Sequence, residues 1–213
     1  MTDTTKNKFA YYLENSMYIN VTNLCTNKCV FCIRSSGDSV GGVNLVLDKE
    51  NFTHEEIIKE VQNTLRENTK EIVFCGYGEP LIKLEIVREV AKFLKENYPD
   101  IPVRVNSNGH GNLIHKRNII PQIAGLIDKI SISLNAENAE LYAELAKPSF
   151  EKEKAFEAVK EFIAECVRKG IDTTATVVTG YKDYEIDVEA CRKITEDLGA
   201  KFRIREWLPQ GYE

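Results

Sequence analysis

The sequence predicts an α/β fold, a partial (β/α)6 TIM-like barrel with parallel strands. Two observations predict it: apolar, strand-like segments alternate with amphipathic helical segments, and the strand-like segments number six rather than eight. They fall near residues 17–23, 71–75, 102–106, 129–134, 172–179 and 201–207. Right-handed crossovers place such strands side by side and parallel, and two missing units leave the barrel open on one side.

The helical segments fall near residues 53–65, 84–94, 137–146, 152–169 and 184–198. The first begins with a capping-box pattern, because Thr53 is followed three residues later by Glu56. Gly170 is placed to end the fourth helical segment, 152–169. The stretch 112–126 is less regular, because Pro121 interrupts its apolar pattern.

Length and composition favour one domain over residues 1–213. The chain is 43% apolar and carries a formal net charge of −5, so we expect a folded core and no basic surface for nucleic acid. The opening Met-Thr-Asp-Thr-Thr-Lys-Asn-Lys leads into no apolar signal core. No segment approaches the roughly 20 apolar residues of a membrane-spanning helix. We therefore expect a cytoplasmic protein without a membrane segment.

Three cysteines, Cys25, Cys29 and Cys32, lie in one short run after the first strand. Thiolate is the ligand that iron-sulfur clusters and zinc prefer, and a short loop gathers several at little cost in chain entropy. No fourth Cys or His follows until His54, inside a predicted helix, so one metal position is left for an outside ligand. The alternative is a helix face of buried thiols, which the polar run 22–27 disfavours.

The spacing Cys-x-x-x-Cys-x-x-Cys, with Phe31 before the third cysteine, resembles the motif of the radical S-adenosylmethionine superfamily. The resemblance implies that the three thiolates bind three irons of a 4Fe-4S cluster and that S-adenosylmethionine chelates the fourth. One electron from the reduced cluster then cleaves S-adenosylmethionine to methionine and a 5′-deoxyadenosyl radical, which takes hydrogen from a substrate that the sequence does not identify. The resemblance also assigns Phe31 to the cofactor site.

The turn after the second strand adds to this resemblance. Gly76-Tyr77-Gly78-Glu79, followed by Pro80, is similar to the glycine-rich turn that binds the methionyl amino group in this superfamily. Glycine lets backbone groups approach a ligand closely. The alternative is an ordinary strand ending, since glycines end many strands.

Polar residues at the next two strand ends are further candidates for contacts with S-adenosylmethionine. Asn106 and Asn108 belong to a segment similar to the family's third-strand ending, and Ser133 and Asn135 to the strand that meets the ribose and carboxylate. The alternative is that these strands end in Asn caps.

The longer block from Asn23 to Arg34, with the segment 37–45, is most similar to the TatD-associated (TatD-linked) group of this superfamily, which has no settled reaction. Because Arg34 and Asp38 lie close to the cysteines in sequence, we consider them substrate ligands. The alternative for this stretch is a flexible, glycine-rich connection.

Two more residues are considered as substrate ligands. His110 follows the Asn-Gly turn and would serve as a proton donor or ligand; a solvated loop histidine is the alternative. Arg205 alternates with Arg203 and Trp207 along the last strand, so one face either points basic groups into the barrel or faces solvent.

The remaining cysteines are assigned differently. Cys166 and Cys191 lie in apolar helical patterns and are expected in the core. Cys75 ends a strand beside the glycine turn and could face the site, but we favour simple burial. Because the sequence ends at Glu213 without further cysteines, we expect no auxiliary clusters.

Three functions remain open from the sequence. The first is a radical enzyme that acts on a small molecule, a peptide or a partner protein at the open barrel side, reduced by a flavodoxin- or ferredoxin-like donor. The second is a glycyl-radical-activating enzyme or a deazapurine synthase, the latter disfavoured by Ile33, where that family usually has an acidic residue. The third is a 4Fe-4S electron-transfer or carrier module, which needs no nucleoside pocket.

Overall fold

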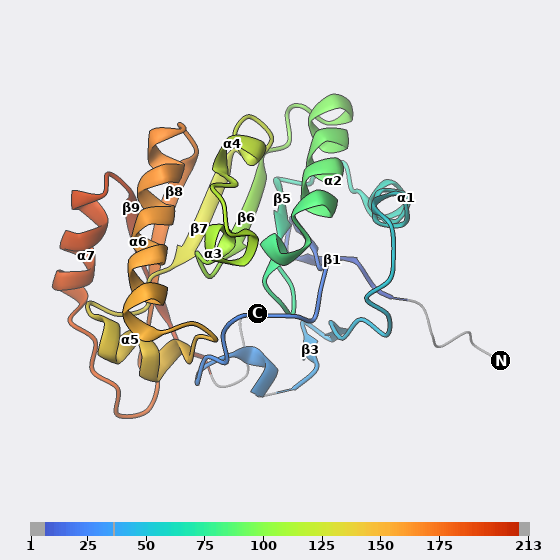
Figure 1. Cartoon of the computed structure of the whole chain (residues 1–213). Helices are drawn as coiled ribbons and strands as arrows, with labels where there is room; N and C mark the ends of the chain where they lie inside the picture. The colour runs from blue at the N-terminus through green and yellow to red at the C-terminus, as the bar shows by residue number, and fades with distance from the viewer. Residues whose placement is uncertain (1–6, 36, 209–213) are drawn as a thin grey trace.

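A computed structural model describes residues 7–35 and 37–208; the first six residues and the last five, considered above, lie outside it. Its main sheet has seven strands in the order β1-β2-β5-β6-β7-β8-β9 (Figure 1). They are β1 (Ala10–Leu13), β2 (Ser16–Ile19), β5 (Glu71–Phe74), β6 (Val103–Ser107), β7 (Lys129–Ser133), β8 (Asp172–Thr179) and β9 (Lys201–Glu206). All neighbours pair in parallel except β1 and β2, which are antiparallel.

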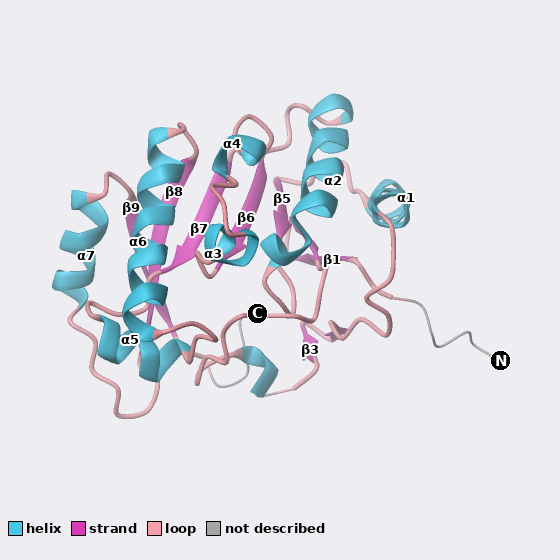
Figure 2. Ribbon diagram, viewed as in Figure 1, coloured by secondary structure: helices cyan, strands magenta, loops and turns pink. Residues whose placement is uncertain are grey.

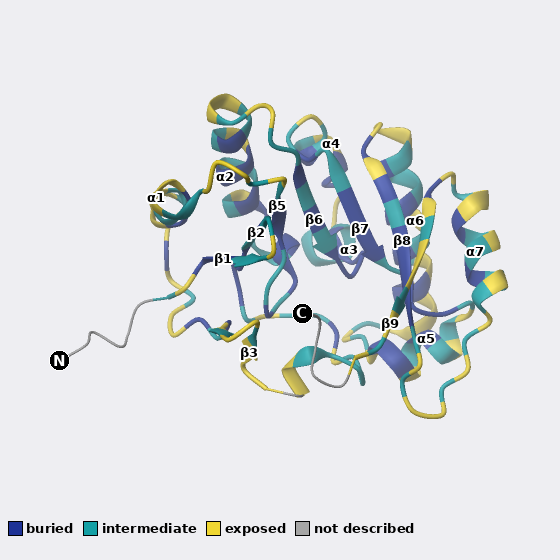
Figure 3. Cartoon of the chain, turned by 180° about the vertical axis from the view of Figure 1, so that it is seen from behind, coloured by how far each residue is buried: buried dark blue, intermediate teal, exposed yellow. Residues whose placement is uncertain are grey.

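Helices cover one face of this sheet, and the other face is seen from behind (Figures 2 and 3). The α-helices are α1 (His54–Thr64), α2 (Leu84–Asn97), α3 (Gly111–His115), α4 (Ile120–Ile123), α5 (Ala139–Ala146), α6 (Lys152–Arg168) and α7 (Val188–Asp197). Two 3-10 helices are η1 (Ile33–Ser35) and η2 (Pro80–Lys83). The arrangement is the predicted partial barrel, which ends at the edge strands β1 and β9.

The six predicted parallel strands are confirmed, each to within a few residues at its ends. The Val and Ile residues of β5, β6, β7 and β8 are buried between the helices and the barrel interior, which is typical of parallel sheets, whereas the edge strand β9 is largely exposed. Parallel pairing brings their carboxyl ends to one edge of the sheet, where α5 and β3 lie at the bottom of Figure 1. The predicted site residues at strand ends therefore share that edge.

Two strand pairs were not predicted. β1 forms a hairpin with β2. The sequence did not predict β1, because its four residues give little local strand signal and it pairs only in the folded chain. β3 (Ser39–Val40) pairs with β4 (Val43–Asn44), so the alternative of a flexible connection, considered above for the stretch 34–42, is wrong in part. Gly41 and Gly42 both have positive φ, 53° and 76°, as a two-residue hairpin turn requires.

Helix ends follow the capping chemistry of the sequence. The capping box is confirmed, because the Glu56 carboxylate accepts a hydrogen bond from Thr53 N at 2.8 Å. α7 begins later than predicted, since Asp187 accepts a hydrogen bond from Ala190 N at 2.9 Å and so caps the helix there. The irregular stretch 112–126 becomes two short helices, α3 and α4.

The core lies between the sheet and the helices. Phe74 and Phe162 are fully buried in it, and so are Cys166 and Cys191, as predicted. In the described residues no helix combines the length and the apolar character that a membrane crossing needs.

We predict that Cys166→Ala lowers the free energy of unfolding by about 1–2 kcal/mol, because the lost thiol leaves a small cavity in the core. Urea denaturation of the two proteins measures this difference. Since Cys166 lies on α6 away from the cysteine loop, the variant should fold to the same structure. A loss above about 4 kcal/mol would contradict a purely packing role.

Candidate functional site

The loop that carries the three cysteines is docked against the end of α5. Lys28 N donates a hydrogen bond to Ala146 O at 3.0 Å, and Val30 N donates one to Leu145 O at 2.9 Å. Ser149 N returns a hydrogen bond to the loop at Thr26 O, at 2.8 Å. Backbone hydrogen bonds thus hold the loop at Thr26, Lys28 and Val30, independently of any side chain.

The turn 76–79 holds the loop from the other side. Glu79 N donates a hydrogen bond to Leu24 O at 2.8 Å. A Cβ atom on Gly78 would overlap Leu24 O and would lie 2.6 Å from Thr22 O, and one on Gly76 would overlap the Asn20 side chain. The two glycines are therefore needed for this close packing, a reason that the sequence motif did not reveal.

Cys25, Cys29 and Cys32 are free thiols, all partly exposed. Cys25 Sγ accepts hydrogen bonds from Asn27 N at 3.4 Å and from Asn108 Nδ2 at 3.8 Å. Burial is the main cause that raises the pKa of Cys25 to about 11 and that of Cys29 to about 12. Bound cations are therefore needed to hold these sulfurs as thiolates at neutral pH.

The chemistry of the three thiols fits an iron-sulfur cluster. Cysteine thiolates are the ligands that hold such clusters in proteins. A cluster presents a separate iron to each thiolate, so its ligands need not meet at one point. Three partly exposed sulfur donors on one pinned loop fit such a group.

A cavity of about 250 Å³ opens beside the loop at the carboxyl edge of the sheet. Seven of the predicted site residues line it: Cys29, Phe31, Cys32, Gly76, Asn106, Ser133 and Arg205. They come from the cysteine loop and from the ends of β5, β6, β7 and β9. The structure thus joins metal-ligating thiols, strand-end polar groups and one cation in a single space.

Three residues of this cavity were missed or misassigned. Tyr11 and Tyr18 enter it from the β1–β2 hairpin, with rings stacked at 5.5 Å between centroids. The Tyr11 hydroxyl donates a hydrogen bond to Cys75 O at 3.3 Å. Cys75 itself lines the cavity, so the prediction of simple burial was wrong. The alternation of Tyr11 with Leu13 was the available sequence signal for a strand here. Only the hairpin shows toward which side the Tyr11 side chain points.

Glu79 is buried and joins the glycine turn to the end of β6. Its carboxylate accepts hydrogen bonds from Leu81 N at 3.1 Å, Ser107 Oγ at 2.9 Å and Asn108 N at 2.6 Å. Burial raises its pKa from 4.5 to about 7. The predicted cofactor residue is 3% exposed and directs its oxygens at protein donors.

Asn108 and His110 form a polar layer behind the cysteine loop. Asn108 Nδ2 donates a hydrogen bond to Thr26 Oγ1 at 2.9 Å, and His110 Nδ1 lies 3.3 Å from the same oxygen. His110 Nε2 lies 3.1 Å from the Tyr142 hydroxyl. His110 is fully buried, so the solvated alternative is wrong, and burial lowers its pKa to about 4. The imidazole is therefore neutral near pH 7.

The end of β7 places Ser133 at the cavity and Asn135 behind it. Asn135 has a left-handed φ of 63° and is 1% exposed. Its Oδ1 is buried without a hydrogen-bond partner among the described residues. On β6, Asn106 Oδ1 accepts a hydrogen bond from Arg104 Nη1 at 2.5 Å.

The predicted substrate residues Arg34 and Asp38 lie outside the cavity and hold their loop to Tyr77. The Tyr77 hydroxyl donates to Asp38 Oδ1 at 2.7 Å, and the Arg34 guanidinium lies 4.8 Å from the centre of the Tyr77 ring. Arg34 Nη1 also donates to Asn23 O at 2.9 Å. Tyr77, predicted to contact the cofactor, is buried and anchors this loop.

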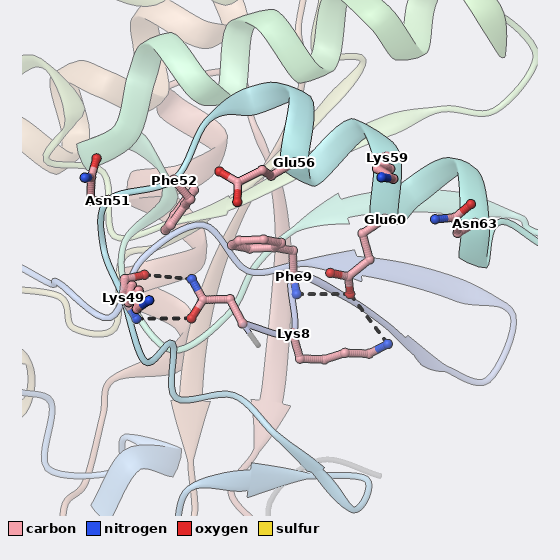
Figure 4. Close-up of a pocket in the computed structure, with 10 residues that line it drawn as sticks. Lys8, Phe9, Lys49, Asn51, Phe52, Glu56, Lys59, Glu60 and Asn63 are labelled. Atoms are coloured by element: carbon pink, nitrogen blue, oxygen red, sulfur yellow. Dashed lines mark hydrogen bonds and ion pairs between the residues drawn. The ribbon is translucent and has the colours of Figure 1, made fainter. Parts of the chain in front are cut away.

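A larger hollow of about 620 Å³ lies at α1 and the first described residues (Figure 4). Asn7 and Lys49 are joined there by two hydrogen bonds, and Glu60 accepts one from Phe9 N at 3.1 Å. None of the predicted site residues lines it. The cavity beside the cysteines is therefore the candidate site.

We predict that Gly78→Ala displaces the cysteine loop, because the added methyl group meets two backbone carbonyls that have no room to move. The rate of alkylation of Cys25 by iodoacetamide, followed by peptide mass spectrometry, should rise several-fold. Gly170→Ala is the control for a general loss of stability: its φ of 75° strains an alanine in the turn after α6, but its Cβ atom meets no other atom. Equal rates in the two variants would refute the packing role of Gly78.

We predict that Glu79 makes stability depend on pH. A carboxyl group whose pKa is raised in the folded state stabilises that state at low pH and loses this contribution as pH rises from about 4.5 to about 7. The free energy of unfolding of the wild type should therefore fall relative to that of Glu79→Gln across this range. Urea denaturation at several pH values measures it; parallel curves would contradict the raised pKa.

Sequence comparisons agree with this geometry. The family model described as Radical SAM superfamily matches residues 19–194. Similar curated proteins include GTP 3′,8-cyclase of Alkaliphilus oremlandii, 27% identical over 201 residues, which are 92% of this chain and 57% of that protein. The RNA methyltransferase RlmN of Nitratiruptor sp. is 28% identical over 205 residues, 84% of this chain and 50% of that protein. The chain thus spans little more than half the length of these relatives.

Solved structures agree on the fold. The chain resembles anSMEcpe with bound AdoMet, with a TM-score of 0.61 at 15% identity over 90% of this chain and 50% of that one. It also resembles methylornithine synthase (PylB), with a TM-score of 0.57 at 15% identity over 90% and 53% of the two chains. Members of the matched superfamily use a 4Fe-4S cluster and S-adenosylmethionine. Because the family model covers most of its length, the chain is an enzyme that belongs to the radical S-adenosylmethionine superfamily.

Proposed function

We propose that Cys25, Cys29 and Cys32 bind the 4Fe-4S cluster and that the cavity beside them holds S-adenosylmethionine and an unidentified substrate. The observation that carries this proposal is that Cys29 and Cys32 share a cavity with the strand-end residues Gly76, Asn106 and Ser133. When bound, the two cofactors supply the one-electron chemistry by which this superfamily takes a hydrogen atom from a substrate.

The chain's own residues prepare the cluster ligands. Hydrogen bonds from Asn27 N and Asn108 Nδ2 to Cys25 Sγ favour its thiolate, because donors to sulfur stabilise the charged form. The backbone bonds to Leu145 and Ala146 fix where the loop lies. Because these hydrogen bonds are made between groups of the protein, they hold the loop before the cofactors bind.

For S-adenosylmethionine we assign two sets of residues, those that contact it and those that support them. Phe31, Gly76, Asn106 and Ser133 contact it in the cavity. Their support comes from residues predicted from the motif that do not line the cavity: Tyr77, Gly78, Glu79, Asn108 and Asn135. Of these, Asn135 has a buried Oδ1 without a hydrogen-bond partner among the described residues.

We further propose that residues 1–213 act as one catalytic domain of the TatD-associated group in the cytoplasm. One core cluster of buried residues runs from Phe9 to Ala200, which supports a single unit. A flavodoxin- or ferredoxin-like donor supplies the electron, and a substrate or partner protein reaches the site from the open side between β1 and β9. Arg34, Asp38 and His110 then act by holding loops rather than by touching the substrate.

A second candidate is a reaction on a purine nucleotide, which the similarity to GTP 3′,8-cyclase favours. The similarity stays below 30% and spans 57% of those proteins. Adding GTP to the reduced enzyme should then raise the yield of 5′-deoxyadenosine several-fold. No change in yield, and no altered nucleotide, would remove this candidate.

We predict that Cys25→Ala loses most of the cluster iron after anaerobic reconstitution and forms no 5′-deoxyadenosine from S-adenosylmethionine under reduction. Iron analysis, visible absorption and product chromatography measure the two effects. Cys166→Ala is the matched control, because it removes a core thiol and should keep both. Full iron content in Cys25→Ala would overturn the ligand assignment.

A further inference from the structure

The candidate cavity continues into a second hollow of about 420 Å³ along the barrel interior. The two share Tyr18, Asn106 and Arg205 in their linings. Arg104 and Arg203 are added in the second hollow, so three arginines from β6 and β9 face one space. Cations gathered in one hollow repel one another, and such an arrangement calls for an anion.

One of these arginines is already neutralised by the protein. Arg104 donates to Glu71 through Nε at 3.1 Å and Nη2 at 2.8 Å, a two-point ion pair. Its Nη1 donates to Asn106. Arg104 therefore has its charge balanced and its donors used, and it forms a fixed wall of the hollow.

Arg203 differs from Arg104. Over the part of the chain that the structure describes, no hydrogen bond or ion pair engages its guanidinium. Burial lowers the pKa of Arg203, and the nearby charges of Arg205 and Arg104 lower it further. Arg203 is an exposed cation whose guanidinium has no directly bonded partner among residues 7–35 and 37–208.

Arg203 and Arg205 are two residues apart on β9 and so project from the same face of the strand, about 6–7 Å apart along it. Glu206, which borders the hollow, alternates to the other face. Asp172, on the neighbouring strand, is paired with Lys201 at 2.7 Å. Glu71, the carboxylate whose charge acts on Arg203, is already bound by Arg104, so no carboxylate of the described residues forms an ion pair with Arg203.

We propose that Arg203 and Arg205 bind an oxyanionic group of the substrate, a phosphate or a carboxylate. The inference rests on the proposed function and adds a substrate class to it. Guanidinium groups bind both oxyanions through paired hydrogen bonds. Because Arg205 lines both spaces, an anion held there places the rest of a small substrate beside Cys29 and Cys32.

Calorimetric titration of the anaerobically reconstituted protein at low ionic strength tests this site. The probes are phenyl phosphate, benzoate and uncharged benzyl alcohol, which share one ring and differ in charge. We expect at least one anion to bind and benzyl alcohol not to bind. Arg203→Gln and Arg205→Gln should each lower the affinity for the anion about tenfold or more, since each variant loses a charge-assisted hydrogen bond. Arg168→Gln, which removes an exposed cation from α6, should bind as the wild type does.

A preference for phenyl phosphate assigns a phosphate-bearing substrate, and a preference for benzoate assigns a carboxylate. Failure of both anions to bind better than benzyl alcohol, or equal affinities in Arg203→Gln and Arg168→Gln, would overturn the site. S-adenosylmethionine cleavage by the wild type is measured in the same preparation. Cleavage without anion binding overturns this inference alone, whereas Arg203-dependent binding without cleavage overturns the proposed function alone.

Discussion

The close packing of the cysteine loop on the turn after β5 is the constraint on which the rest of the site depends. Gly78 has no Cβ atom, so the carbonyls of Thr22 and Leu24 lie directly against it, and Glu79 N bonds Leu24 O. A side chain at Gly78 would push away the segment that leads into Cys25. Together with the backbone hydrogen bonds to the end of α5, this contact sets where the three sulfurs lie.

Glu79 extends the same constraint to the next strand. Its carboxylate accepts hydrogen bonds from Ser107 and Asn108 at the end of β6, so the ends of β2, β5 and β6 are joined below the cavity. Asn108 then returns to the cysteine loop through Thr26. These hydrogen bonds connect the cysteine loop to the ends of β5 and β6, and a hydrogen bond is stronger in surroundings of low polarity.

The barrel interior separates two kinds of surroundings. Near the thiols the cavity is lined by aromatic and aliphatic groups such as Tyr11, Phe31 and Val178. Farther along it, Arg203 and Arg205 supply positive charge. The end near Cys29 and Cys32 thus has mainly aromatic and aliphatic side chains and the other end has arginines, with Arg205 in both linings.

The sequence by itself determined the six parallel strands and most helices, because apolar periodicity and caps are local properties, and its cysteine spacing predicted the three thiol ligands that we propose. It did not determine which candidates line the cavity. Glu79 and His110 were predicted to meet ligands, yet both are buried among protein partners, since their burial depends on residues 28 to 45 positions away in the chain. β1 was missed for the same reason: its pairing brings Tyr11 into the site only after the hairpin forms. Tertiary structure alone decided which polar groups are satisfied by the protein and which, such as Asn135 Oδ1, have no partner among the described residues.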